Sequence, residues 1–182
     1  MMNTSKIVSL FYTILEVYTK FETVSKLYQY TAIDEFSRLR FLAAYCEQCT
    51  YSSADFLEKL VAWYKRRGIT VECVQTDNGQ EFTKRFSSYG GSDKPTIFQV
   101  RLQQHGIKHK LIRPFTPRHN GKVERSHRKD NERFYSTHTF YSFEDFSKQL
   151  KLYNRRDYNN FPMRPLGWHS PRQVLNDYLS SL

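Results

Sequence analysis

The sequence predicts one α/β domain, in which helices pack on a central β-sheet. Its length of 182 residues is that of a single domain with a hydrophobic core. Hydrophobic residues make up 39% of the chain and aromatic residues 16%, so the composition excludes a wholly disordered protein. Apolar patterns typical of strands alternate with patterns typical of helices, as expected for a layered α/β fold.

The N-terminal segment, residues 1–27, is compatible with either a helix or a strand. The segment is rich in β-branched and aromatic residues, which favours a strand. The helix fits at least as well, and both alternatives stay open. Apolar residues at helical spacing favour the helix: Ile7, Leu10, Phe11, Ile14, Leu15 and Tyr18.

A β-hairpin is predicted next. Residues 27–33 and 39–46 are rich in apolar and β-branched side chains and form its two strands. Residues 34–37 form the tight turn between them.

A helix and a buried strand follow the hairpin. Ser52 or Ser53 is the predicted N-cap of a helix that runs to about residue 67 and has one apolar face. Gly68 ends this helix. The short apolar run at residues 69–75 suits a strand that is buried on both faces.

The second half of the chain is predicted to be mainly helical. Pro114 and Pro117 mark a loop, and Asn120 caps the helix that follows it. Ser170 and Pro171 begin the last helix. The predicted elements are a helix at 96–105, a strand at 107–112, and helices at 120–135, 143–158 and from 171 onward.

The charge of the chain favours a polyanionic partner, most often nucleic acid. The formal net charge is +10 and the pI is about 9.5. The stretch from Lys108 to Arg133 holds nine basic and three acidic residues, and therefore +6 of that net charge. Such clustering predicts a surface that binds phosphate groups.

The cysteine, histidine and tryptophan residues give weaker signals. Three cysteines argue against a disulfide framework and for a reducing compartment. The core is the expected place for Trp63 and Trp168, rather than a base-stacking surface. A zinc site is a minor alternative, built from two pairs with suitable spacing: Cys46 with Cys49, and His105 with His109. No apolar run approaches the roughly 20 residues of a membrane span.

Asp77 and Glu124 are the candidate catalytic carboxylates. Asp77 follows the strand at 69–75, where the active sites of α/β proteins tend to lie. Taken alone, each has a simpler explanation, since Asp-Asn-Gly often forms a turn and Glu124 could pair with nearby cations. Together, inside a basic segment, they suit a site that holds Mg²⁺ against phosphate.

Four motifs in order resemble the integrase core of insertion-sequence transposases and retroviral integrases, with the bacterial insertion-sequence branch most similar. The resemblance extends from about residue 28 to 178 and implies an RNase H-like fold with a mixed central sheet flanked by helices. The motifs are Ala32-Ile-Asp-Glu-Phe-Ser-Arg38, Thr76-Asp-Asn-Gly-Gln-Glu-Phe82, Ile112-Arg-Pro-Phe-Thr-Pro-Arg-His-Asn-Gly-Lys-Val-Glu-Arg125, and a tail with Tyr153-Asn and Ser170-Pro-Arg-Gln-Val-Leu175.

The resemblance implies a metal site of two aspartates and one glutamate, which binds Mg²⁺ or Mn²⁺. Asp77 matches the second acid and Glu124 the third. The implied partners are DNA, as transposon ends and target, and further copies of the chain; no membrane is implied. The implied location is the bacterial cytoplasm, in association with the nucleoid. The expected DNA-binding residues are Arg113, Asn120, Lys122, Arg125 and Arg128.

The first catalytic aspartate of the family has no match in this sequence. It precedes the hairpin in the family, but residues 1–33 contain no Asp, and their acids are Glu16 and Glu22. Asp34 matches the hairpin turn instead of the catalytic position. We therefore divide the chain into a non-matching segment, residues 1–27, and an integrase-like core with C-terminal helices, residues 28–182.

Two functions follow, and the sequence leaves the enzymatic status open. The first is DNA transposition or integration, by metal-dependent cleavage and strand transfer of phosphodiesters. The alternative is a catalytically inactive remnant that only binds DNA or an intact transposase. A nuclease that acts on RNA hybrids is a third interpretation, which the motif set disfavours. A first carboxylate in the folded site favours activity, and its absence favours the remnant.

Overall fold

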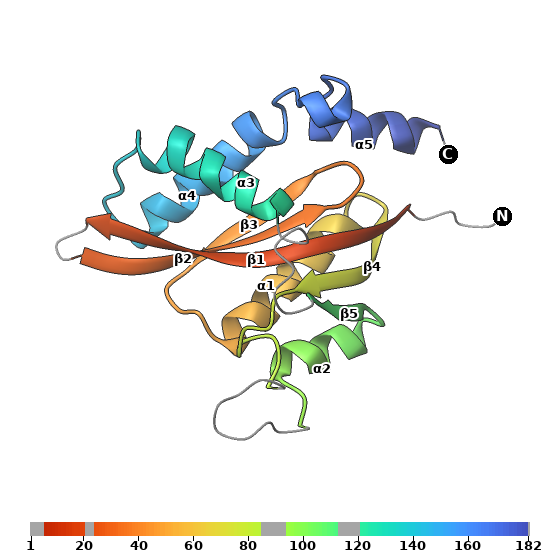
Figure 1. The fold of residues 1–182 in the computed structure, drawn as a ribbon, viewed down its shortest axis with the longest axis horizontal. Helices are drawn as coiled ribbons and strands as arrows, with labels where there is room; N and C mark the ends of the chain where they lie inside the picture. Colours follow the sequence, from red (N-terminus) through yellow and green to blue (C-terminus); the bar gives the residue numbers. More distant parts are fainter. Residues whose placement is uncertain (1–5, 21–23, 85–93, 113–120, 182) are drawn as a thin grey trace.

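The computed structural model describes residues 6–20, 24–84, 94–112 and 121–181, and it confirms the mixed sheet (Figure 1). Five strands lie in the order β3-β2-β1-β4-β5. β1 is antiparallel to β2 and parallel to β4. The strands are β1 (Lys6–Lys20), β2 (Val24–Asp34), β3 (Arg40–Tyr45), β4 (Ile69–Thr76) and β5 (Lys108–Leu111).

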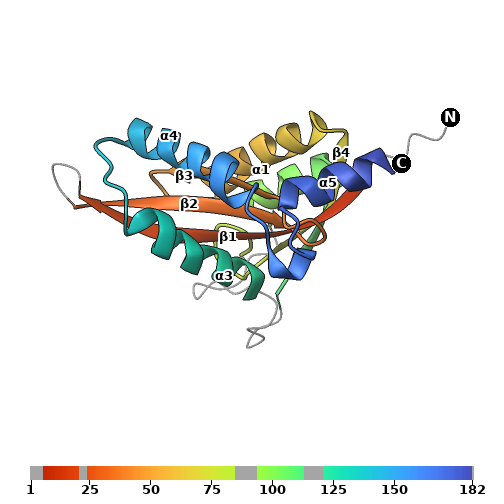
Figure 2. The same cartoon turned by 90° about the horizontal axis from the view of Figure 1, so that it is seen from above.

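Helices cover both faces of this sheet. α1 and α2 lie on one face, and α3 and α4 lie on the other (Figures 1 and 2). A π-helical turn continues α3 at Asn131–Tyr135, and a second one continues α4 at Asn154–Tyr158. The helices are α1 (Thr50–Lys65), α2 (Ile97–Gln104), α3 (Gly121–Asp130), α4 (Phe143–Tyr153) and α5 (Pro171–Ser180).

The N-terminal segment forms β1, the central strand, so the helical alternative is wrong and the strand alternative is confirmed. Val8, Leu10 and Tyr12 are buried in the core beneath α1 and α2, whereas Phe11 and Val17 are buried on the face of α3 and α4. A strand that is buried on both faces shows no apolar alternation. Its apolar residues can therefore also match helical spacing.

The hairpin and the helix after it agree with the predictions except at one boundary. α1 begins at Thr50, and its N-cap is Cys49 rather than the predicted Ser52 or Ser53. The Cys49 sulfur accepts a hydrogen bond from the Ser52 backbone N–H at 3.5 Å. The sequence did not indicate this cap because cysteine is not among the favoured N-cap residues. Gly68 has φ +69°, which suits the left-handed turn that ends the helix.

The core between the sheet and helices α1 and α2 combines aliphatic side chains with a cluster of aromatic rings. Tyr12 and Phe56 stack with ring centroids 4.8 Å apart. Trp63 is partly buried against this core, as predicted. Trp168 is 69% exposed, so its predicted place in the core is wrong. In the described part of the chain, no helix has the length and apolar character needed to cross a membrane.

Candidate active site

Asp77 lies directly after β4, and the turn that follows it fixes its carboxylate. Its Oδ1 accepts a hydrogen bond from the Gly79 backbone N–H at 3.0 Å. Burial raises the pKa of Asp77 above its ordinary value, and the Gly79 hydrogen bond only partly opposes this shift. The Glu81 carboxylate lies close to Gly79, so that a Cβ there would come within 2.6 Å of its oxygen and the Glu81 side chain would have to move.

The ends of β4 and β5 are tied together around this carboxylate. The Ile112 backbone N–H donates to the Thr76 carbonyl at 2.9 Å, and the Asn78 side-chain amide donates to the Ile112 carbonyl at 3.0 Å. The Thr76 hydroxyl lies 2.9 Å from Nε2 of His109. These contacts hold the segment around Asp77 rigidly at the sheet edge.

Glu124 lies in the first turn of α3, and its side chain is exposed. The neighbouring Val123 is fully buried and packs with Phe11 of β1 and Ile33 of β2. α3 therefore lies over the face of β1 to which Phe11 points. A third carboxylate that joined Glu124 would have to come from this face.

Two of the five predicted DNA-binding residues are placed by the structure. Arg125 and Arg128 are exposed on α3, next to Glu124 in sequence. Arg113, Asn120 and the side chain of Lys122 lie outside the described residues.

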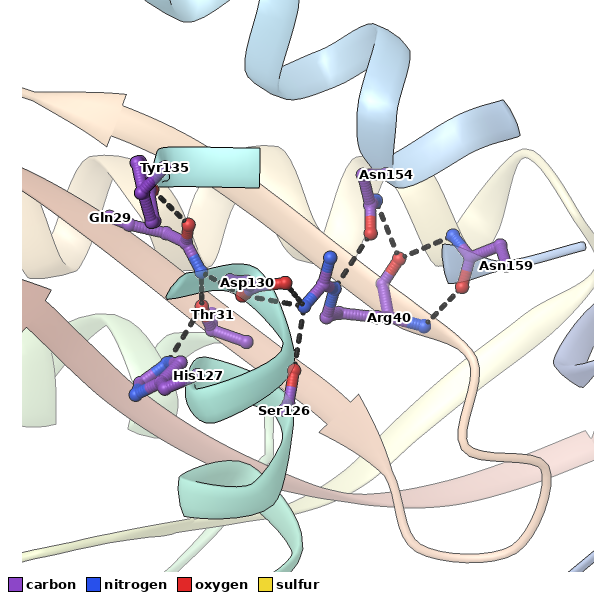
Figure 3. Close-up of polar contacts among 9 residues, drawn as sticks. All are labelled: Gln29, Thr31, Arg40, Ser126, His127, Asp130, Tyr135, Asn154 and Asn159. Atoms are coloured by element: carbon purple, nitrogen blue, oxygen red, sulfur yellow. Dashed lines mark hydrogen bonds and ion pairs between the residues drawn. The ribbon is translucent and has the colours of Figure 1, made fainter. Parts of the chain in front are cut away.

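A buried ion pair anchors α3 to the sheet (Figure 3). Arg40 and Asp130 have side chains that are 0% exposed, and Nη1 of Arg40 lies 2.8 Å from both Asp130 carboxylate oxygens. The same nitrogen donates to Ser126 of α3, and Nε of Arg40 donates to Asn154 at 2.8 Å. Asn159 accepts from the Arg40 backbone N–H at 2.9 Å. β3, α3 and the end of α4 are thereby locked together.

The network continues along β2 (Figure 3). The Gln29 side-chain NH₂ donates to Asp130 and to Thr31, each at 2.9 Å, and the Tyr135 hydroxyl donates to the side-chain oxygen Oε1 of Gln29. Thr31 also contacts His127 of α3 at 3.3 Å. This network is not predicted from the sequence. Its one sequence signal is an arginine in a strand of otherwise apolar and small residues.

Burial lowers the pKa of His127 to about 4, and burial also lowers the pKa of His109 to about 4. At pH values between this lowered pKa and the ordinary pKa of about 6.5, such a histidine is neutral in the folded protein and takes up a proton on unfolding. Stability is therefore lost as the pH falls through that window.

We expect the free energy of unfolding to fall by about 2 kcal/mol per buried histidine between pH 7 and pH 5. Urea unfolding at the two pH values measures this change. His127→Gln should remove about half of the combined effect, because it leaves only His109 to titrate in this way. If the free energy of unfolding of His127→Gln fell by as much as that of the wild type between pH 7 and pH 5, His127 would not contribute to the pH dependence.

β1 offers no carboxylate to the α3 face. Glu16 is the one acidic residue of the strand, and it pairs with Lys26 at 2.8 Å. Side chains alternate along a strand, so Glu16 shares the face of Tyr12, which points to α1. Glu22 lies outside the described residues.

Thr13 is the residue on the α3 face of β1 that lies nearest to Asp77 in the strand register. Phe11 is level with Gln75 in the parallel pairing, so Thr13 is level with Asp77 two residues further on. Thr13 pairs with Thr31, which contacts α3 through His127.

Asp34 has the predicted structural role in the hairpin turn. Its carboxylate accepts a hydrogen bond from the Ser37 backbone N–H at 2.8 Å, and it is 1% exposed. The Arg38 backbone N–H donates to its carbonyl oxygen at 3.0 Å.

The donor set does not fit a metal site with three carboxylates. The described ranges contain no group of three or more His, Cys, Asp or Glu residues that could hold a metal ion. This also argues against the zinc alternative. His105 instead lies 2.9 Å from Glu58. The cysteines at 46, 49 and 73 are free thiols.

Comparison with known proteins identifies the family. Two models described as "Integrase core domain" match residues 11–117 and 105–171. The chain belongs to the integrase core family. The first match begins inside β1, within the N-terminal segment, residues 1–27.

Two relatives are named as an integrase and as a protein of an insertion element. The ORF3 protein of Spiroplasma virus SpV1-C74, which has the name integrase, is 33% identical over 111 residues. The uncharacterized 39.2 kDa protein of insertion element IS476 from Xanthomonas euvesicatoria is 33% identical over 106 residues. These matches cover 60% and 58% of this chain but only 31% and 27% of the relatives, so the chain spans about a third of their length.

Solved integrase cores share the fold. The HTLV-2 integrase catalytic core, solved with magnesium in a trimeric form, has a TM-score of 0.63 and 15% identity, covering 93% of this chain and 95% of that one. The BIV integrase core has a TM-score of 0.62 and 18% identity, covering 97% of both chains. The predicted RNase H-like fold is thereby confirmed.

Proposed function

We propose that this integrase core binds DNA but has lost most or all of its strand-transfer chemistry. One observation supports the loss above all others: the single carboxylate of β1, Glu16, lies on the face of α1, opposite to α3. Thr13, on the α3 face, has a neutral hydroxyl in place of a charged ligand. A divalent ion that binds to oxygen ligands would lack one of its expected carboxylates.

The basic charge around α3 supports DNA binding. Arg125 and Arg128 are exposed on this helix, and the segment from Lys108 to Arg133 holds most of the net charge. Arg113, Asn120 and Lys122 belong to the same segment and are proposed to contact the DNA backbone as well. Contacts of this kind release counterions and give binding that weakens with salt.

Metal-dependent polynucleotidyl transfer is the second candidate function. The retained carboxylates favour it, since Asp77 is held at the sheet edge and Glu124 lies on the helix above the sheet. With Mg²⁺ or Mn²⁺ bound, they would support attack of water, and then of a DNA 3′-hydroxyl, on a phosphodiester. Association with further copies, or with an intact transposase, could supply what this chain lacks.

The two candidates differ in the nicking of labelled duplex DNA with Mg²⁺ or Mn²⁺. We expect the wild type to bind DNA in a salt-sensitive way and to nick it no more than the variants Asp77→Asn and Glu124→Gln do. Replacing Arg125 and Arg128 by Gln should lower the magnitude of the salt slope by about one for each residue. Wild-type nicking that both carboxylate variants abolish would instead reveal a complete site and support the transferase.

A further inference from the structure

A groove of about 530 Å³ lies between α3, the hairpin turn and the segment that links α4 to α5. Four cations line it: Arg38, Arg125, Lys129 and Arg164. Its lining includes no Asp or Glu residue. The first residue of α3, Gly121, forms part of its wall, so the groove adjoins the turn of α3 that bears Glu124. The charge of this surface favours an anionic ligand.

Arg38 gives an independent sign of such a ligand. Its Nη1 atom is buried and has no hydrogen-bond partner in the part of the chain that the structure describes. A buried donor of this kind is costly unless a partner satisfies it. Nearby, burial and then the charges of Arg133 and Arg125 lower the pKa of Lys129, which reflects the same excess of positive charge.

Aromatic residues at the rim of the groove suit a nucleobase. Trp168 is 69% exposed and Phe161 is 43% exposed, although both are large and apolar. The Trp168 backbone N–H donates to the Met163 carbonyl at 3.0 Å, so the backbone of this exposed residue is fixed in a hydrogen-bonded turn. Arg38 and Trp168 are the two non-glycine residues with positive φ among those described, at 61° and 65°. Such strained residues tend to cluster at functional sites.

We propose that this groove binds a short unpaired stretch of DNA strand beside the duplex. The four cations that line the groove, Arg164 among them, bind its phosphates, and Trp168 stacks on a base. Cations combined with exposed aromatic rings are the means by which proteins hold single strands without sequence preference. The inference deepens the proposed DNA binding and rests on it.

The test compares an oligothymidylate with a blunt duplex of equal length, each labelled with fluorescein, by fluorescence anisotropy without metal. Trp168→Ala should weaken single-strand binding by about tenfold and leave duplex binding within about twofold. Tyr141→Ala removes an aromatic side chain that is 81% exposed elsewhere and should change neither. Arg164→Gln should weaken single-strand binding more than Arg156→Gln, which removes an exposed charge outside the groove.

The intrinsic fluorescence provides a second readout. The oligothymidylate should quench the wild-type emission, and this quenching should be lost in Trp168→Ala, where Trp63 still reports folding. Unchanged single-strand affinity in Trp168→Ala, or equal loss for both probes, would overturn the groove assignment. Failure of the wild type to bind the duplex would contradict the proposed function instead.

Discussion

Replacing Asp130 by alanine is expected to lower the free energy of unfolding by about 3–5 kcal/mol, because it leaves the Arg40 charge buried without its partner. Both side chains are 0% exposed, so the Arg40 charge has no direct access to solvent that would compensate for the lost carboxylate. The Gln29 amide loses its acceptor on Asp130 in the same step. Urea unfolding followed by circular dichroism measures the change.

The exposed pair of Lys59 and Asp55 is the matched control. Its side chains are 54% and 50% exposed, so Asp55→Ala should cost about 1 kcal/mol or less. Replacing both buried partners, as Arg40→Met with Asp130→Leu, should restore much of the lost stability, since no unpaired charge remains. Equal effects of the buried and the exposed single variants would show that the buried pair does not anchor α3.

Thr13→Asp is expected to raise metal-dependent nicking by at least about 100-fold over the wild type, because it supplies a carboxylate on the α3 face. Position 13 is level with Asp77, and it pairs with Thr31 of β2, which contacts His127. Thr13 is only 9% exposed, so a charged carboxylate there should be stable only when a cation binds it.

Thr13→Asn controls for size without charge and should stay inactive. Adding Asp77→Asn or Glu124→Gln to Thr13→Asp should abolish the gained activity. Circular dichroism of each variant shows whether it is folded. A folded Thr13→Asp protein that bound metal no better than the wild type would show that another β1 position faces Glu124.

Most of the fold could be predicted because the elements have distinct sequence patterns. α1 has an apolar face and ends at a glycine with positive φ, and β4 is a short apolar run. β1 could not be assigned, because a central strand buried on both faces lacks alternation. Trp168 was misplaced because an exposed tryptophan cannot be distinguished by sequence from a buried one.

The candidate site could also be predicted only in part from the sequence. Asp77 and Glu124 are predictable from the sequence because each lies at an element boundary within a recognisable motif. The pairing of Arg40 with Asp130 joins residues 90 positions apart, and only the folded chain brings them together. The face to which Glu16 points depends on the register of β1, which the sequence did not determine.

Calorimetric titration with Mn²⁺ tests the central claim most directly, with the wild type and Thr13→Asp compared under the same conditions. For the wild type, we predict no saturable Mn²⁺ binding that depends on Asp77 and Glu124. For Thr13→Asp, we predict saturable Mn²⁺ binding, and adding Asp77→Asn should abolish it. Tight Mn²⁺ binding by the wild type that Asp77→Asn or Glu124→Gln abolishes would contradict the account, because it would require a third ligand that β1 does not present on the α3 face.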